Sequence, residues 1–503
     1  MFVVVFFVLV ILIVVYRYYD QDRKYWSRRG IPGPSPALFF GNLIQVSERF
    51  RPRSLVLRDW SEKYGKMYGI SEGRRKYLVL SDYEMVTEML TKKFAQFHGR
   101  AKMPLQDVVQ GPRTNIIEAW GAQWKRLRAL GTPAFSNNSL KKVRPTIEHS
   151  AHLMLDFLEV AATKGEVNVV DFFQEYTMGI ICKLALGKKD IKMFANPYRD
   201  AVNGIFSQTL TSPIQAVPCL FPSARDPWHH LLDVVGNLCG VVHIRLLNDL
   251  RAHVAQRKKE RANGDTNDYS DFIDMLLDAE VGQEEIDYDA EGREISRKLA
   301  FEEVVQQCFI FLLAGYETTA TSLSYVTHFL ANHPQIQAKM TEEIDAVCTD
   351  EEISFEQLAE LRYTECVIKE TLRHFPLASF VVTRECMEST QLGDVAIERG
   401  TSIYTDTWTI HMDTRLWGED AREFRPERWL DGSLTAPRAA FQGFGEGPRM
   451  CLGMRLAFME EKVALAHLLR RFSIRTTEKT NPLRLMGCFT VYPEQVIVRV
   501  DKR

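Results

Sequence analysis

A glycine-rich segment with one cysteine carries the residue types that point most directly to chemistry. It spans 444–453 and reads F-G-x-G-x-R-x-C-x-G, and a helical pattern of apolar residues follows Cys451. A helix N-terminus offers free N–H groups and partial positive charge, and both lower the pKa of a cysteine. Arg449 lies two residues before the cysteine and can reach an anionic group. The segment therefore predicts a thiolate that binds a metal beside an anionic ligand.

A single cysteine is more often a small buried hydrophobic residue. Here, however, Phe444, three glycines, Arg449 and Cys451 fall at fixed offsets. The glycines suit a backbone that turns tightly against a flat ligand, and a thiolate-ligated haem is such a ligand. The segment resembles the haem-binding loop of the cytochromes P450. The resemblance implies haem b (iron protoporphyrin IX) as cofactor, Cys451 as the iron ligand, and Phe444 and Arg449 beside the cofactor.

A long helix is expected from about residue 301 to residue 332, and A-G-x-E-T-T lies at its centre, from Ala314 to Thr319. Glycine and threonines are poor residues for a helix interior, and a threonine hydroxyl can bond back to the preceding turn. The motif resembles the oxygen-activation motif of the P450 central helix. That resemblance gives Thr318 and Glu317 a role in proton delivery and puts Gly315 beside the cofactor. The alternative is that both polar residues are ordinary members of a buried helix.

Three further residues resemble the positions that hold the haem propionates in P450s. Trp124 and Arg128 are four residues apart, so a helix presents them on one face. Arg384 follows a segment that resembles a strand of the P450 pocket. Without the cysteine segment, a packed tryptophan beside a solvated arginine would explain the first pair.

Glu370 and Arg373 form an E-x-x-R pair that shares a helix face. Such pairs are common on solvated helices, so the pattern alone is weak. Downstream, residues 424–429 read F-R-P-E-R-W and resemble the P450 motif whose arginine joins that pair. The resemblance implies a buried structural triad of Glu370, Arg373 and Arg428.

The N-terminus predicts a membrane anchor. Residues Phe2 to Tyr16 are all apolar or aromatic; as a helix they span about 23 Å, less than the ~30 Å bilayer core. Tyr18 and Tyr19 extend the run, and basic residues follow it, which places the rest of the chain in the cytosol. A cleaved signal peptide is the rival, but no small-x-small cleavage site follows the run.

The sequence therefore divides the chain into three expected parts. We expect a transmembrane signal anchor over 1–20, a basic stretch and proline-rich hinge over 21–36, and a P450 catalytic domain over 37–503. The resemblance to microsomal P450s implies a single-pass anchor in the endoplasmic reticulum membrane, with the catalytic domain on its cytosolic side.

Three connecting segments are expected between the motifs. Residues 101–119 predict a loop, because they contain Gly and Pro and little periodicity. The resemblance to P450s implies that this loop roofs the substrate pocket. Residues 210–228 predict an apolar loop that dips into the bilayer or else packs into the core. Residues 263–298 predict a polar surface connector.

The composition fits a protein that can bury a large core. The chain has 503 residues, 46% of them hydrophobic, and a net charge of −2, which gives no support for nucleic-acid binding. Its nine cysteines form no C-x-x-C pair or zinc pattern, which suggests a reducing compartment. It shows no G-x-G-x-x-G after a strand and no P-loop, so electrons from a nicotinamide must come through another protein.

The resemblance covers nearly the whole chain and looks closest to the animal family-3-like branch, including nematode members. It implies a mainly α P450 fold with a smaller β portion, and haem between the central long helix and the helix after the cysteine loop. The leading hypothesis is a monooxygenase that inserts one oxygen atom into a lipophilic small molecule such as a foreign compound, steroid or fatty acid. Its implied partners are NADPH-cytochrome P450 reductase, with cytochrome b5 as a second donor, and membrane lipid.

Two other functions remain open at this point. A P450-type peroxide isomerase needs no reductase, but it also has no need of the proton-delivering threonine. A non-enzymatic haem sensor would bind haem and consume no NADPH. The apolar candidates for the pocket lining (Phe309, Phe311, Phe380, Phe489) indicate a lipophilic ligand without identifying it.

Overall fold

The structure is a computed structural model of the chain. It describes all residues except 1, 49–50, 102–112, 189–191, 240–241, 265–270, 282–285, 289–293, 297–298, 379–380, 431–435 and 489. Most of the expected roof loop at 101–119, and both Phe380 and Phe489, therefore lie outside the described residues.

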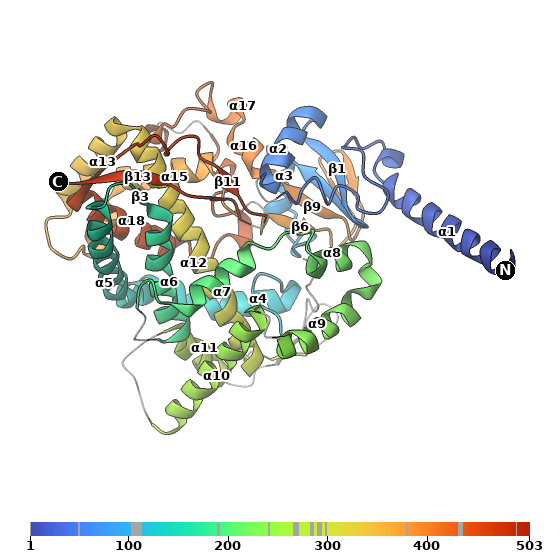
Figure 1. Cartoon of the computed structure of the whole chain (residues 1–503), viewed down its shortest axis with the longest axis horizontal. Coiled ribbons are helices and arrows are strands. Elements are labelled where there is room, and N and C mark those ends of the chain that lie inside the picture. Colours follow the sequence, from blue (N-terminus) through green and yellow to red (C-terminus); the bar gives the residue numbers. More distant parts are fainter. Residues whose placement is uncertain are drawn as a thin grey trace.

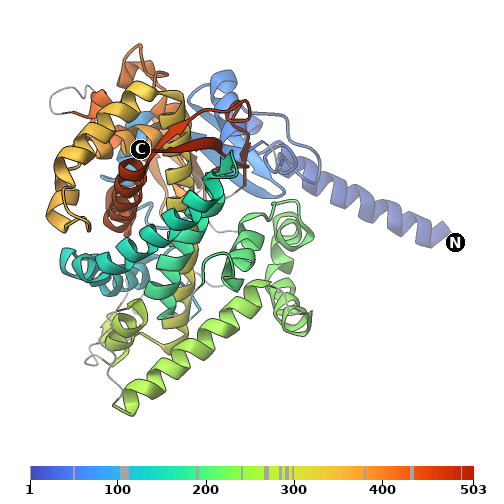
Figure 2. The ribbon, with the colours of Figure 1, turned by 60° about the vertical axis from the view of Figure 1, so that its left-hand side comes forward.

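A single long helix, α12 (Phe301–Asn332), crosses the centre of the molecule (Figures 1 and 2). Its 32 residues give a length of roughly 48 Å. It is buried on most sides, because apolar side chains occur all around it. Glu302 and Glu303 in its first turn complement the helix dipole. It packs most extensively against α6 (Val169–Leu186) and also contacts α18 (Met454–Arg471). The expected central helix is confirmed with these bounds.

Other helices surround α12 and form most of the molecule (Figure 1). Those before it are α2 (Arg53–Tyr64), α3 (Tyr83–Leu90), α4 (Gly121–Gly131), α5 (Asn137–Ala162), α7 (Pro197–Phe206), α8 (Pro213–Leu220), α9 (Arg225–Cys239), α10 (Val242–Ala262) and α11 (Phe272–Val281). Those after it are α13 (Pro334–Val347), α14 (Phe355–Glu360), α15 (Arg362–His374), α16 (Thr407–His411) and α17 (Thr414–Trp417). Short 3-10 turns include η3 (Pro222–Ala224), η5 (Pro426–Trp429) and η7 (Gly447–Arg449).

The strands form small sheets at the side of this helical body. The largest has the order β1-β2-β9-β6, and its β2–β9 pairing is parallel. Its members are β1 (Met67–Glu72), β2 (Arg75–Leu80), β6 (Thr383–Glu385) and β9 (Ser402–Thr405). A second sheet contains β10 (Phe472–Arg475), β13 (Ile497–Lys502) and β3 (Val167–Asn168). Three two-stranded pairs are β4 (Ile286–Tyr288) with β5 (Glu294–Ser296), β7 (Thr390–Leu392) with β8 (Val395–Ile397), and β11 (Leu485–Met486) with β12 (Tyr492–Pro493). The predicted fold class, mainly α with a smaller β portion, is confirmed.

The N-terminal helix α1 (Phe2–Arg23) projects away from the body in both views. Its 22 residues form a helix of roughly 33 Å, which is long enough for a bilayer core, although the uninterrupted apolar run ends at Tyr16. Among the described residues it is the one helix long and apolar enough to cross a membrane. Near its end, the Tyr19 hydroxyl donates to the Leu220 carbonyl oxygen at 3.2 Å, so α1 meets α8.

Two predicted connectors contain more structure than expected. Residues 210–228 form α8, η3 and the start of α9 instead of a loop. The reason is that Pro213 occupies the first turn of α8, where its missing N–H costs nothing and its fixed φ suits a helix. Within 263–298, the described residues form α11, β4 and β5, so the prediction of a plain surface connector was wrong there.

Candidate active site

Cys451 lies between η7 and α18, where the backbone is held in one conformation. Gly447 has φ of 73°, and a Cβ at this position would lie 2.0 Å from the Leu90 carbonyl oxygen, so only glycine fits. The Cys451 N–H donates to the Phe444 carbonyl oxygen at 2.8 Å. Seven of the eight described cysteines are buried, and Cys451 is the exposed one, because it faces a cavity.

The pKa of Cys451 is shifted in the direction opposite to the one that the sequence predicts. Burial in the cavity wall raises the pKa of the Cys451 thiol. The N–H groups of Gly453 and Met454 and the charges of Arg128 and Arg100 lower it, as a helix N-terminus predicts, but they do not offset the burial. The expected lowered pKa was therefore wrong for the protein chain alone, since burial outweighs the helix terminus.

The cavity has a volume of about 650 Å³ and lies between the Cys451 loop and the central helix. It brings together Cys451, Thr318, Gly315, Trp124, Phe444 and the predicted arginines Arg128, Arg384 and Arg449. These residues are far apart in the sequence and come from α4, α12, β6 and the Cys451 loop.

Four arginines converge on the wall of this cavity beside Cys451. Three of them, Arg128, Arg384 and Arg449, are predicted by the sequence, and the fourth is Arg100. The Arg449 guanidinium lies 4.7 Å from the ring centre of Trp124, a cation–π contact, and donates to the Ala119 carbonyl oxygen.

The other arginines are likewise tied to backbone carbonyls. Arg128 Nη1 donates to the Met450 carbonyl oxygen at 2.7 Å, and Arg384 Nη1 to that of Thr383 at 2.7 Å. Arg100 Nε donates to the Val381 carbonyl oxygen at 3.0 Å. Neutral acceptors therefore orient the four cations without neutralising them.

Within the described part of the chain, no carboxylate pairs with these arginines. Burial, reinforced by the charge of Arg100, lowers the pKa of Arg384 to about 9. Burial also lowers the pKa of Arg100 to about 10, and that of Arg449 falls far below its ordinary value. The buried Nε atoms of Arg384 and Arg449 lack a hydrogen-bond partner. A ligand with two carboxylates would satisfy both the charges and these atoms, so the residues present fit a haem and its propionates.

Thr318 and Glu317 lie on different sides of α12. The Thr318 hydroxyl lines the cavity and donates to the Ala314 carbonyl oxygen at 2.7 Å, the expected bond to the preceding turn. Glu317 is buried against α6, where Gln174 Nε2 lies 3.5 Å from its Oε2. Burial raises the pKa of Glu317 to about 7, against the influence of Thr321 and Arg199. The structure therefore brings Thr318, but not Glu317, to the cavity wall beside Cys451.

Gly315 has a packing role in addition to its place on the cavity wall. A Cβ at Gly315 would lie 2.7 Å from the Ile181 side chain on α6. A larger residue would require the end of the Ile181 side chain to move, so glycine favours the close contact of α12 and α6.

The comparisons with known proteins agree with this site. The family model described as Cytochrome P450 matches residues 31–498. The chain is similar to the Putative cytochrome P450 CYP13A10 of Caenorhabditis elegans, with 39% identity covering 97% of this chain and 96% of that protein. It is 40% identical to the Putative cytochrome P450 CYP13A3 of the same organism, covering 97% of each. The chain belongs to the cytochrome P450 family. It is a haem-thiolate monooxygenase of a nematode-type branch, and the family implies a redox partner and a lipophilic substrate.

In this P450, Glu370, Arg373 and Arg428 lie together and are almost fully buried. Glu370 accepts from Arg373 at 2.8 and 2.9 Å and from Arg428 Nε at 2.9 Å. Burial alone would raise the pKa of Glu370, but the bonds from Arg373 and His374 outweigh it and hold that pKa far below its ordinary value. The Trp429 indole also donates to Glu370 at 2.9 Å, a contact that the sequence analysis did not anticipate.

His411 connects this cluster to the Cys451 loop. Its Nδ1 lies 3.0 Å from the Arg373 carbonyl oxygen, and its Nε2 accepts the Gln442 N–H at 2.9 Å. Burial and the charge of Arg373 lower the pKa of His411 to about 3, so the ring is neutral and can accept this bond. The triad thus positions the loop that begins two residues after Gln442.

The polar residues on the cavity wall that sequence reasoning missed include Arg100, Ser322 and Glu461. Arg100 belongs to no motif with a recognisable spacing. Ser322, however, follows Thr318 by one helical turn, and Glu461 interrupts the apolar pattern of α18. Both residues could therefore have been identified from the sequence. Burial raises the pKa of Glu461 to about 8, with Ser322 acting against it, and Glu461 Oε2 has no hydrogen-bond partner. A protonated acid therefore lies in the cavity wall at neutral pH.

Away from Cys451, the cavity is largely apolar. Phe309 and Phe311 line it as expected, together with Ile205, Phe206, Leu232 and Ile244. These residues extend the cavity toward α7, α9 and α10, which gives room for a ligand beside the cofactor.

Proposed function

We propose that this P450 is a microsomal monooxygenase that oxidises a lipophilic small molecule with electrons from NADPH-cytochrome P450 reductase. The observation that carries the proposal is the cavity in which Cys451, four uncompensated arginines and Thr318 face the same space. This arrangement supplies a metal ligand, a dianion site and a hydroxyl for proton transfer beside an apolar chamber.

The residues proposed to hold haem b divide into two groups. Cys451 would ligate the iron, and Phe444 and Gly315 would lie against the cofactor. Arg128, Arg384 and Arg449, together with Arg100 and the Trp124 ring, would hold the two propionates, because charge-assisted bonds are the strongest available to buried arginines. When bound, a thiolate-ligated haem supplies the electron push that favours O–O cleavage.

Thr318 is proposed to hold and pass on protons at the cavity wall, since its hydroxyl is fixed by the Ala314 carbonyl oxygen. Glu317 on α12 and Glu460 and Glu461 on α18 are buried acids with raised pKa values, and of these Glu317 and Glu461 are the two proposed proton donors to Thr318. Glu317 is the acid of the motif and faces α6, whereas Glu461 and Ser322 line the cavity itself. We propose that Thr318 receives protons from these acids, with Glu461 the better placed of the two.

We propose that residues in the N-terminal half of the chain attach the protein to a membrane. Residues 1–20 would form the anchor, 21–36 the basic and proline-rich hinge, and 37–503 the catalytic domain on the cytosolic side of the endoplasmic reticulum. The α1 helix meets α8, and Phe221 and three α9 residues (Leu231, Val234, Val235) are exposed apolar side chains. This apolar surface beside the anchor supports contact of α8 and α9 with lipid. Cytochrome b5 is proposed as a second electron donor.

A spectrum tests the cofactor assignment. The dithionite-reduced protein should give a strongly red-shifted Soret band with carbon monoxide, and Cys451→Ala should abolish it. A band at the ordinary imidazole-haem position would refute Cys451 as ligand. Turnover of a lipophilic panel with reductase and NADPH then tests the reaction, and turnover that ignores both would favour a peroxide isomerase.

A further inference from the structure

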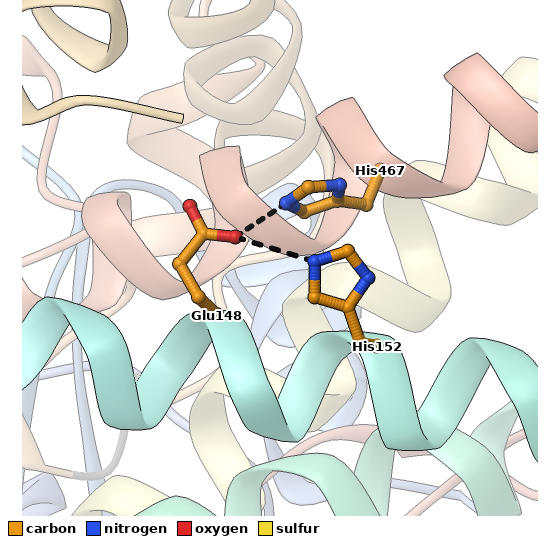
Figure 3. Close-up of side chains that lie close together, drawn as sticks. All are labelled: Glu148, His152 and His467. Carbon is orange, nitrogen blue, oxygen red and sulfur yellow. Dashed lines mark hydrogen bonds and ion pairs between the residues drawn. The ribbon is translucent and has the colours of Figure 1, made fainter. Parts of the chain in front are cut away.

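Three side chains of types that can ligate a metal lie close together between α5 and α18, outside the active site (Figure 3). Glu148 and His152 are one turn apart on α5, and His467 comes from α18. Their ligand atoms lie within 4.8 Å of one another. Glu148 Oε2 is 2.5 Å from His467 Nε2 and 3.9 Å from His152 Nε2, so both imidazoles face one carboxylate oxygen.

The other oxygen of Glu148 is already held in place. Its Oε1 accepts the backbone N–H of Ile353 at 3.0 Å and lies 3.4 Å from Arg144 Nη1. Carboxylates that bind metals are commonly oriented in this way by hydrogen bonds to the oxygen away from the ion. The carboxylate therefore presents Oε2 to the two imidazoles.

The positive charges beside the cluster have their own acidic partners. Arg144 lies 3.2 Å from Glu352, and Arg471, whose charge acts on His152, lies 2.9 Å from Asp156 and 2.6 Å from Glu159. Neither arginine therefore opposes a cation at Glu148 with an uncompensated charge.

The cluster can be reached from solvent on one side. Glu148 and His467 are buried, whereas 38% of the His152 side chain is exposed. His152 thus marks the route by which an ion would enter from solvent.

We propose that Glu148, His152 and His467 bind a zinc ion, with water as the fourth ligand. Zinc takes histidine nitrogen and carboxylate oxygen at about 2.0–2.2 Å in tetrahedral geometry, which separates ligand atoms by roughly 3.3 Å. The two observed separations of 2.5 and 3.9 Å lie on either side of that value, so small side-chain rotations suffice. Imidazole ligands disfavour calcium and magnesium, which prefer oxygen.

A simple buried ion pair explains the cluster less completely. It accounts for the Glu148–His467 contact, but it leaves His152 Nε2 too far from the carboxylate for a hydrogen bond. An ion between the three groups gives each nitrogen a partner. Because α18 starts directly after the Cys451 loop, zinc would tie this helix to α5 and stabilise the haem-binding side of the fold without touching the active site.

The test uses the haem-loaded full-length chain in detergent, treated with a chelator and then titrated with zinc alone. Equilibrium dialysis with elemental analysis should find one zinc per chain, and free zinc at 100 times its Kd should raise the thermal unfolding temperature. His152→Ala removes a ligand that is partly exposed, so the fold should survive. His149→Ala is the matched control, because His149 is exposed on the same helix and outside the cluster.

Loss of an orienting partner alone weakens metal binding by about 10- to 100-fold, so His152→Ala should weaken zinc binding by more than 100-fold. His149→Ala should bind as the unaltered protein does. His467→Gln, which keeps a donor for Glu148, should also lose zinc. Absence of bound zinc in the unaltered protein, or equal binding by His152→Ala and His149→Ala, would overturn the proposal. Neither result would bear on the monooxygenase reaction.

Discussion

Replacing Arg384 by glutamine should change the haem-free and the haem-loaded protein in opposite directions. Arg384 is buried, its Nη1 donates to the Thr383 carbonyl oxygen, and its Nε has no partner among the described residues. Without an anion its pKa falls to about 9, some three pH units below an ordinary guanidinium. That difference corresponds to about 4–5 kcal/mol against the charged form, as an upper value.

The two states should therefore respond differently to Arg384→Gln. In the haem-free chain, the substitution removes a buried charge and should raise the free energy of unfolding by up to a few kcal/mol. In the loaded chain, it removes a charge-assisted bond of about 1.5–3 kcal/mol, so haem should be lost roughly 10- to 150-fold faster.

Urea unfolding of the two forms and the rate of haem transfer to an excess of a haem-binding acceptor protein measure these effects. Arg399→Gln, at an exposed arginine, is the control and should change neither. The pH dependence gives a further check. Because the folded pKa of Arg384 is lowered, the unfolded chain holds more protons above about pH 9, and the haem-free protein should gain stability as pH rises through that value. A fall in haem-free stability in Arg384→Gln, or unchanged haem loss, would refute the reasoning.

Four other outcomes are expected. Cys451→Ser should keep the fold but lose the red-shifted carbon monoxide band, whereas retention of that band would exclude Cys451 as the ligand. Arg428→Leu should lower the free energy of unfolding by about 1.5–3 kcal/mol, because it removes a buried charge-assisted bond to Glu370, which Arg373 still pairs; a loss under 1 kcal/mol in denaturant titration would contradict this. Since the pKa of Glu370 is lowered in the fold, its stabilisation is present above its unfolded pKa and lost toward acid, so Glu370→Gln should flatten the acid side of the stability curve. Glu461→Gln should raise the hydrogen peroxide released per NADPH several-fold, and Glu317→Gln should raise it less; the reverse order would make Glu317 the proton source.

The sequence by itself identified the functional residues that lie close to one another along the chain. The offsets around Cys451, the A-G-x-E-T-T motif and the E-x-x-R pair are properties of one turn or one loop, so neighbouring residues carry the whole signal. The same holds for α12, because its own sequence has apolar residues on all sides of the helix along its length, and this pattern predicts a buried helix. It holds also for the apolar N-terminal run, although only the structure extended α1 to Arg23.

The tertiary structure decided what depends on facing elements. Arg100 joins Arg384 and Arg449 only because chain segments hundreds of residues apart meet at one cavity, and no local pattern encodes that meeting. The pKa of Cys451 is raised because burial, which is a property of the whole fold, outweighs the local helix terminus. Likewise, Glu317 faces Gln174 on α6 and not the cavity, because the packing of α12 against α6 decides which side of the helix is turned toward Cys451. Spacing along the chain thus identifies the reactive side chains. Packing between distant segments determines their pKa values and whether they face the cavity.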